Sequence, residues 1–256
     1  KELQAHGIQT LEDLARAPSP LVLGTALGRL PAYEKVKAQA EIQARARESG
    51  ERQYELLDLI PDAGLSALPQ PSDGDVFFDI ESDQFVGESG LEYLFGYVYR
   101  NDDDELTYQY EWAFKPSEEK EMFERFVDFV TERRKRYPHM HVYHFAPYEP
   151  SALKRLMGRF ASREDQVDNF LREGVFVDLL AVVRNGVRAS VESYSLKKLE
   201  PFFGFERKVS LHEANVALTQ LTHHIELDHS GTLATETMSI VQRYNADDCY
   251  ATAALR

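Results

Sequence analysis

Val76-Phe77-Phe78-Asp79-Ile80-Glu81 places two acidic side chains at alternate positions of a short apolar run. A run of this length and composition predicts a buried β-strand. Alternate side chains of a strand point to the same face, so the carboxylates of Asp79 and Glu81 are expected side by side. Burying unpaired charge is costly, and a pair of divalent cations is the partner that suits several converging carboxylates. For this motif alone, a strand edge that enters the acidic loop Glu81-Ser82-Asp83 is the alternative.

The residues that follow predict an α/β domain. Two segments rich in aromatic and β-branched residues, 91–100 and 106–114, are separated by a turn sequence, so an antiparallel meander of three strands is expected. Ser117 is expected to cap a long amphipathic helix. The later segments alternate, with strands at 141–145 and 175–179 and helices at 150–160, through Val183, and from Thr235 onward. This order indicates a ribonuclease H-like mixed sheet, an antiparallel meander plus parallel strands, flanked by helices.

Two further acidic motifs lie on predicted helices. Tyr148-Glu149 opens one helix, and Tyr244-Asn-Ala-Asp-Asp248 lies within the last one. Tyr244 and Asp248 are four residues apart and share a helix face, which Asp247 nearly shares. An aspartate beside a phenol can hold a metal while the phenol orients a water. The alternative is an acid that serves the helix dipole, but these residues lie well inside the helix rather than at its start.

The remaining candidates for chemistry are weaker. Cys249 follows Asp248, points to a different helix face and is expected in the core. His223, His224 and His229 fall in a stretch that is expected to be irregular, where a metal site is the less favoured interpretation. Nothing in the sequence has the cysteine and histidine spacing of a zinc site.

The composition limits the class of protein. The sequence has 256 residues, 43% of them hydrophobic, and a net charge of -14, which argues against a protein that coats nucleic acid electrostatically. No stretch approaches the roughly 20 apolar residues of a membrane span, and no secretory signal heads the chain. A single cysteine rules out an internal disulfide and favours the cytoplasm. Basic clusters, at 133–136, 154–163 and 184–188, face either DNA or solvent.

The N-terminal part differs in pattern from the rest. Residues 1–60 are expected to be a helical segment, in which Thr10 caps a helix with Asp13 at its third position. Residues 61–74 are rich in Pro, Asp and Gly and are expected to be a linker. The third part, 75–256, is the expected ribonuclease H-like domain. The sequence starts without methionine and stops within a helical pattern, so a fragment of a longer protein is expected.

The ordered set of acidic motifs resembles the DEDD exonuclease superfamily, Tyr subtype. Residues 75–256 more closely resemble the ribonuclease H-like domain of bacterial RecB-family nucleases. The segments that carry this likeness are Phe78-Asp-Ile-Glu81, Leu91-Glu-Tyr-Leu-Phe-Gly96, Tyr143-His-Phe-Ala-Pro-Tyr-Glu-Pro150, Val177-Asp-Leu179, Ser193-Tyr-Ser-Leu-Lys-Lys-Leu-Glu200 and Tyr244-Asn-Ala-Asp-Asp248.

The resemblance implies a site that holds two Mg²⁺ or Mn²⁺ ions. It assigns metal binding to Asp79, Glu81, Glu149 and Asp248, and the positioning of the nucleophilic water to Tyr244. The second motif departs from the superfamily, which has Asn-x-x-x-Asp where this chain has Phe145-Ala-Pro-Tyr-Glu149. Asp178 is the second choice for that ligand, with a structural role as the alternative, and Asp247 is a reserve for the last motif.

The implied activity is a metal-dependent 3′-5′ exonuclease that acts on single-stranded or frayed DNA in DNA repair or processing. The resemblance also implies adjoining nuclease and helicase domains in the full-length chain, and a helix-hairpin-helix-like N-terminal segment. A catalytically silent ribonuclease H-like module that binds nucleic acid or acts as a scaffold is the alternative from another class. An exonuclease specific for RNA would have the same motifs.

Overall fold

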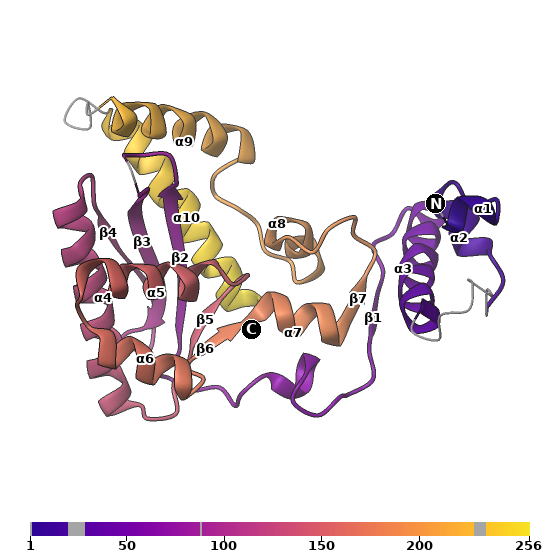
Figure 1. Cartoon of the computed structure of the whole chain (residues 1–256), viewed down its shortest axis with the longest axis horizontal. Helices are drawn as coiled ribbons and strands as arrows, with labels where there is room; N and C mark the ends of the chain where they lie inside the picture. Colours follow the sequence, from indigo (N-terminus) through magenta and orange to yellow (C-terminus); the bar gives the residue numbers. More distant parts are fainter. Residues whose placement is uncertain (1, 20–28, 88, 228–233) are drawn as a thin grey trace. The chain divides into compact units, whose positions relative to one another are not determined.

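A computed structural model describes residues 2–19, 29–87, 89–227 and 234–256 (Figure 1). The chain forms two compact units, the first of Lys1–Ala67 with Ala181–Phe202 and the second of Leu68–Leu180 with Phe203–Arg256. The domain limits expected from the sequence, 1–60, 61–74 and 75–256, stay predictions. In the described part of the chain, no helix combines the length and the apolar character that crossing a membrane requires.

The second unit is built around a five-stranded mixed sheet with the strand order β4-β3-β2-β5-β6. The strands are β2 (Val76–Asp83), β3 (Leu91–Arg100), β4 (Leu106–Trp112), β5 (Val142–His144) and β6 (Phe176–Asp178). Neighbouring strands among β2, β3 and β4 pair antiparallel, whereas β5 runs parallel to β2, and β6 to β5. The predicted α/β class, with an antiparallel meander followed by parallel strands, is confirmed.

Helices cover both faces of this sheet. One face is covered by α4 (Pro116–Arg136), α5 (Tyr148–Phe160) and α6 (Glu164–Arg172), and the other by α10 (Thr235–Leu255), against which α9 (Leu211–Glu226) packs. The alternation of side chains along β2 divides its residues between these layers. Phe78 and Ile80 join the core beneath α4 and α5, while Phe77 packs in the cluster that contains Cys249 of α10. Asp79 and Glu81 therefore belong to the face that α10 covers.

Two expectations about helix boundaries are wrong. Ser117 does not cap α4, because the helix begins one residue earlier at Pro116, whose fixed φ suits the first helical turn. The stretch around His223 and His224 is not irregular but forms the end of α9, a helix that starts with a capping box between Ser210 and Glu213. His229 lies outside the described residues.

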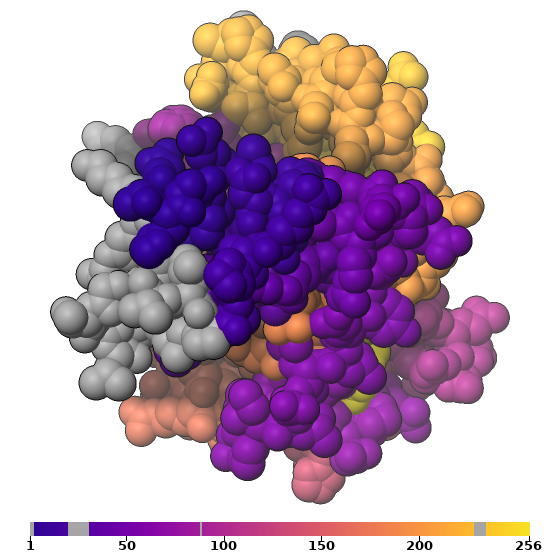
Figure 2. Space-filling model, turned by 90° about the vertical axis from the view of Figure 1, so that its right-hand side faces the viewer, coloured from indigo at the N-terminus to yellow at the C-terminus, as the bar shows by residue number. Residues whose placement is uncertain are grey.

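The first unit contains helices and a two-stranded sheet, with its N-terminal residues drawn in indigo and purple in Figure 2. Its elements are α1 (Glu2–Ala5), α2 (Leu11–Arg16), α3 (Arg29–Ser49), β1 (Tyr54–Leu56), η1 (Gly64–Ala67), β7 (Val187–Ala189), α8 (Leu196–Leu199) and η2 (Glu200–Phe202). The predicted cap of α2 is confirmed, because Thr10 and Asp13 form a capping box. The antiparallel pair of β1 and β7 was not expected from the sequence. The chain passes from the second unit into the first through α7 (Leu179–Gly186).

A buried ionic network ties α4 and α5 to the start of β3. Glu92 and Glu119 are both fully buried, and the backbone N–H of Glu92 donates to Glu119 Oε1 at 2.8 Å. From α5, Arg159 donates to Glu119 Oε2 at 2.7 Å, and Arg155 pairs with Glu92. Burial and the neighbouring Glu92 raise the pKa of Glu119 to about 7. Two residues of the 154–163 basic cluster thus pair with buried acids, and contact of this cluster with DNA stays a prediction.

Glu119→Gln should weaken the dependence of stability on pH. The folded-state pKa of Glu119 lies above its ordinary value of 4.5, so its contribution to stability is full below pH 4.5 and is lost as the pH rises through about 7. Between pH 5 and pH 8, the unfolding free energy of the wild type should fall by about 2 kcal/mol relative to the variant. Urea unfolding at both pH values measures this difference. Parallel pH profiles would mean that Arg159 keeps Glu119 ionised throughout.

Candidate metal centre

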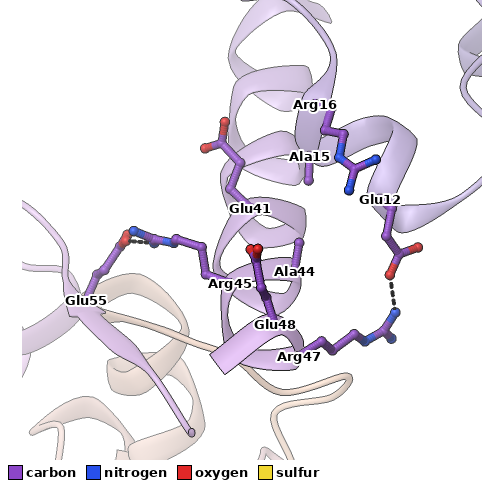
Figure 3. Close-up of a pocket in the computed structure, with 9 residues that line it drawn as sticks. All are labelled: Glu12, Ala15, Arg16, Glu41, Ala44, Arg45, Arg47, Glu48 and Glu55. Carbon is purple, nitrogen blue, oxygen red and sulfur yellow. Dashed lines mark hydrogen bonds and ion pairs between the residues drawn. The ribbon is translucent and has the colours of Figure 1, made fainter. Parts of the chain in front are cut away.

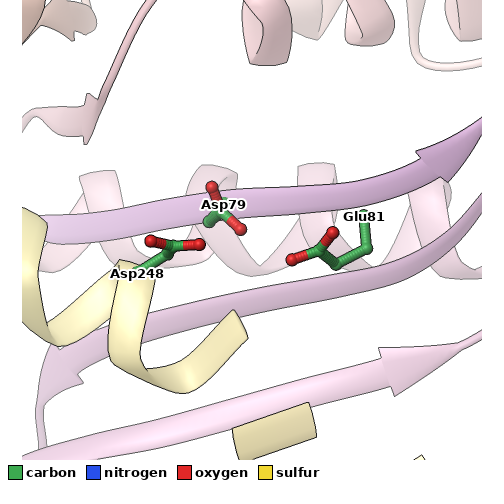
Figure 4. A group of neighbouring side chains, drawn as sticks. All are labelled: Asp79, Glu81 and Asp248. Atoms are coloured by element: carbon green, nitrogen blue, oxygen red, sulfur yellow. The ribbon is translucent and has the colours of Figure 1, made fainter. Parts of the chain in front are cut away.

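Three carboxylates converge between β2 and α10 (Figure 4). Asp79 and Glu81 come from β2 and Asp248 from α10, and each offers one oxygen within 4.8 Å of the others. Asp79 and Glu81 share a face because they are alternate residues of one strand. The register between β2 and β3 shifts directly after Glu81, so the regular pairing that accompanies this alternation ends there. The packing of α10 against β2 brings Asp248 to the two acids of the strand.

A buried amide holds Asp79 in place. Asn245 of α10 is fully buried, and its Nδ2 donates to Asp79 Oδ2 at 2.7 Å. Tyr108 of β4 donates its hydroxyl to Asn245 Oδ1 at 2.7 Å, which fixes the amide orientation. Gly96 of β3 allows this approach, because a Cβ there would lie 1.6 Å from Asn245 Oδ1. A hydrogen-bonded chain from Tyr108 through Asn245 therefore sets the direction of the Asp79 carboxylate.

Cys249 lies one helical turn after Asn245 on α10, and its side chain is buried, as expected. Its Sγ donates to the carbonyl oxygen of Gly96 at 3.2 Å. Burial raises the pKa of the thiol well above its ordinary value. Asn245 and Cys249 of α10 thus both approach Gly96, and a Cβ at this position would displace the Asn245 amide.

An arginine binds the third carboxylate. Arg207 Nη2 donates to Asp248 Oδ1 at 2.5 Å, and the two side chains are only 9% and 7% exposed. The guanidinium also lies 5.4 Å from the centre of the Tyr244 ring. Tyr244 is buried and packs with Val209 and Ala214. The assigned role of Tyr244 in positioning a water stays a prediction.

Asp247 has a different task from its neighbour. Its Oδ2 accepts the backbone N–H groups of Lys208 at 2.8 Å and Val209 at 3.0 Å. These bonds tether the segment that carries Arg207 to α10. In the described part of the chain, Asp247 is not in the group formed by Asp79, Glu81 and Asp248. The contacts give Asp247 a structural role, and its reserve role as a metal ligand stays a prediction.

Glu149 and Asp178 lie at the ends of the parallel strands, where His144 of β5 is in register with Asp178 of β6. Glu149 is buried, its Oε2 lies 3.4 Å from His144 Nδ1, and burial raises the pKa of its carboxyl group. Among the described residues, Glu149 Oε2 has no hydrogen-bond partner. Asp178 Oδ1 instead accepts the N–H groups of Ala146 and Leu180, both at 2.9 Å.

These contacts separate the two candidates for the second motif. Asp178 stabilises the turn before α5, in which Ala146 has a positive φ of 78°, so its oxygen already has a structural task. Glu149 Oε2 is buried and makes no hydrogen bond among the described residues, although His144 Nδ1 lies 3.4 Å away. In the part of the chain that the structure describes, neither residue is in the group of three carboxylates.

The three grouped residues fit a divalent cation. All their donors are carboxylate oxygens, the ligand type that Mg²⁺ and Mn²⁺ prefer. Asp79, Glu81 and Asp248 would hold such an ion. Glu149, the acid of the second sequence motif, is a further candidate ligand because its Oε2 is buried without a hydrogen bond from any described residue. The sequence did not point to Asn245, Tyr108 or Arg207. Of these, only Asn245 could have been found from the sequence, because it lies three residues before Asp248 and so shares a helix face with it.

A charged cavity in the first unit offers a contrast (Figure 3). It measures about 710 Å³ and is lined by Glu12, Ala15, Arg16, Glu41, Ala44, Arg45, Arg47, Glu48 and Glu55. Arg47 pairs with Glu12 at 2.7 Å, and Arg45 pairs with Glu55. The cavity lining contains both acidic and basic side chains, and some of them form ion pairs. It therefore does not concentrate negative charge as the group of Asp79, Glu81 and Asp248 does.

Gly96→Ala should destabilise the protein, because the added Cβ would overlap Asn245 Oδ1. Overpacking of this kind costs about 1–3 kcal/mol. Gly158→Ala in α5 is the matched control, since a Cβ there meets nothing within 4 Å, and alanine favours a helix by about 1 kcal/mol. Urea unfolding at pH 7 compares both variants with the wild type. Equal stability of Gly96→Ala and the wild type would contradict the described packing of Asn245.

A family comparison is consistent with this geometry. A model of the RNase H superfamily matches residues 76–256, which include the whole five-stranded sheet, α10 and all three grouped carboxylates. Comparisons with curated proteins and with solved structures give no significant match. The match covers well over half of the sequence, and the chain belongs to the RNase H superfamily.

Proposed function

We propose that this protein is a divalent-metal-dependent 3′-5′ exonuclease that hydrolyses phosphodiester bonds of DNA by a two-metal mechanism. The observation that carries the proposal is the convergence of Asp79, Glu81 and Asp248, whose oxygens lie within 4.8 Å of one another. Membership of the RNase H superfamily supports a metal-dependent nuclease. A role in DNA repair or processing extends the same proposal.

The Tyr subtype of the DEDD exonucleases is the finer class that we propose, with the RecB-family domain as its nearest likeness. Tyr244 precedes Asp248 by one turn of α10, and both contact Arg207. Glu149 supports the fourth acidic position, because it is buried with one acceptor oxygen that no described residue hydrogen-bonds. The order of acids along the chain and their placement on β2, α5 and α10 agree with that class.

Each residue has a defined task in the proposed reaction. Asp79, Glu81 and Asp248 would hold the divalent cations, with Glu149 as the further ligand, and Asn245 keeps Asp79 oriented. When bound, such cations would supply Lewis acidity. Tyr244 orients the water that attacks phosphorus. The bond to the 3′ oxygen of the preceding nucleotide breaks, which releases a 5′-mononucleotide.

A short single-stranded or frayed end of DNA is the proposed substrate. Several basic residues are already paired with acids of the same protein: Arg134 pairs with Glu173, Arg136 with Asp102 and Arg163 with Asp128. With a net charge of -14, the surface gives little general attraction for a polyanion. Recognition then depends on the site itself, which suits a strand end. Adjoining nuclease and helicase domains, as proposed partners in a longer chain, would deliver such an end.

The ion pair of Arg207 with Asp248 favours a second candidate function. The guanidinium of Arg207 is bound to a predicted metal ligand, and its positive charge offsets the negative charge of that acid without a metal ion. A catalytically silent module that binds nucleic acid or acts as a scaffold would have this arrangement. An exonuclease specific for RNA remains a variant of the first proposal.

Asp79→Asn should abolish nuclease activity, because it replaces a carboxylate of the metal site by a neutral amide. The measurement is the shortening of a 5′-labelled single-stranded DNA with Mn²⁺ or Mg²⁺, and of an RNA of the same sequence. The wild type should give a ladder that EDTA suppresses, and the variant should lose about 10³-fold or more in rate.

Asp103→Asn is the matched control for this assay. It makes the same chemical change in the exposed turn between β3 and β4, away from the acidic cluster, and should retain the wild-type rate. A ladder from RNA alone would change the substrate class. Absence of cleavage of both substrates, with metal present, would favour the silent module.

A further inference from the structure

Arg207 occupies a position that the proposed function does not explain. Its Nη2 lies 2.5 Å from Asp248 Oδ1, and both side chains are more than nine-tenths buried. Asp248 is also one of the three residues whose oxygens lie within 4.8 Å of one another. The same carboxylate therefore serves an arginine and belongs to the candidate metal centre.

Interactions that do not involve Asp248 also help to hold Arg207 in this place. The Tyr244 ring lies under the guanidinium at 5.4 Å, which is within the range of a cation–π interaction. The two residues that follow Arg207, Lys208 and Val209, donate their backbone N–H groups to Asp247. Arg207 is thus directed at the acidic cluster by its own segment, rather than reaching it as a long side chain from the surface.

Electrostatics explains what such a cation does. Three carboxylates at this separation repel one another, and the repulsion is stronger than in bulk water because Asp248 is buried and Asp79 and Glu81 are half-buried. An arginine keeps its charge at any pH that the fold tolerates, so it offsets this repulsion permanently. A divalent cation would offset the same repulsion and would take the same carboxylate as a ligand.

We propose that Arg207 is a resident counter-cation that stabilises Asp248 in the metal-free protein and competes with a divalent cation for that carboxylate. The inference rests on the proposed metal centre. Competition raises the metal concentration at which the site loads, so the acidic cluster is stable without metal and fills only above a threshold. This accounts for an arginine that would otherwise argue for a silent module.

The test is calorimetric titration of the whole chain with Mn²⁺, which measures binding and not activity. Arg207→Gln removes the competitor and should tighten the Mn²⁺ dissociation constant by about tenfold, the effect of losing one ion pair. Lys208→Gln is the matched control, because it removes one positive charge from the neighbouring exposed residue. It should change the affinity by less than about twofold, since exposed charge is screened.

The possible results separate the inference from the proposed function. If the wild type binds Mn²⁺ and Arg207→Gln binds it with equal or lower affinity, the competition is refuted while the metal centre stands. If neither protein binds Mn²⁺ at millimolar concentration, the metal centre fails and the inference fails with it. Equal tightening by Arg207→Gln and Lys208→Gln would also refute it, because the effect would then be one of general charge.

A second variant covers the case in which Arg207→Gln does not fold. Arg207→Lys keeps the positive charge but loses the planar fork that suits a carboxylate. It should bind Mn²⁺ more tightly than the wild type but by a smaller factor. Thermal unfolding adds an independent readout, since Mn²⁺ should raise the melting temperature of either variant more than that of the wild type. Equal shifts in all three proteins would overturn the inference.

Discussion

Mutual repulsion among Asp79, Glu81 and Asp248 is the constraint on which the second unit depends. Carboxylate oxygens within 4.8 Å of one another oppose the approach of α10 to β2, so other interactions must hold this helix in place. The apolar contacts of Val241 and Cys249 with the sheet provide part of that force. Asn245 and Arg207 add to it, because each binds one of the acids directly.

The two polar supports bind different acids of the cluster. Asn245 comes from α10 and reaches Asp79 on β2, so it joins the two elements that carry the acids. Arg207 precedes α9 and reaches Asp248, so it joins the loop to the helix. Asp247 anchors the same loop through backbone bonds. Adjacent aspartates of one helix therefore do different work, which follows from the roughly 100° between successive helical residues.

Strand β3 was predicted to the residue and β2 within three residues, because both have aromatic and β-branched runs bounded by turns. β1 and β7 were missed because each has a charged residue at its centre, Glu55 and Arg188, and so lacks the apolar run that marks a strand. Strand alternation predicted that Asp79 and Glu81 lie side by side, whereas their convergence with Asp248 was expected only from the family resemblance and depends on how α10 packs on the sheet. Arg207 could not be found in this way, because only the tertiary path of its loop brings it to Asp248.

The second motif shows the same limit. The position of Glu149 at the start of α5 followed from its place after an apolar strand. Its contact with His144, and the engagement of Asp178 by two backbone N–H groups, depend on the register of β5 and β6. No local pattern distinguishes an aspartate that accepts such bonds from one that is available to a ligand.

Cys249 gives the protein a built-in reporter of the integrity of this site. It is the single cysteine of the chain, it is buried, and its sulfur contacts the backbone of Gly96 beneath α10. A thiol reagent can reach it only when the helix moves off the sheet, and that same movement separates Asp248 from Asp79. The rate of thiol modification therefore measures how often the acidic cluster opens, on the native protein and without any added label.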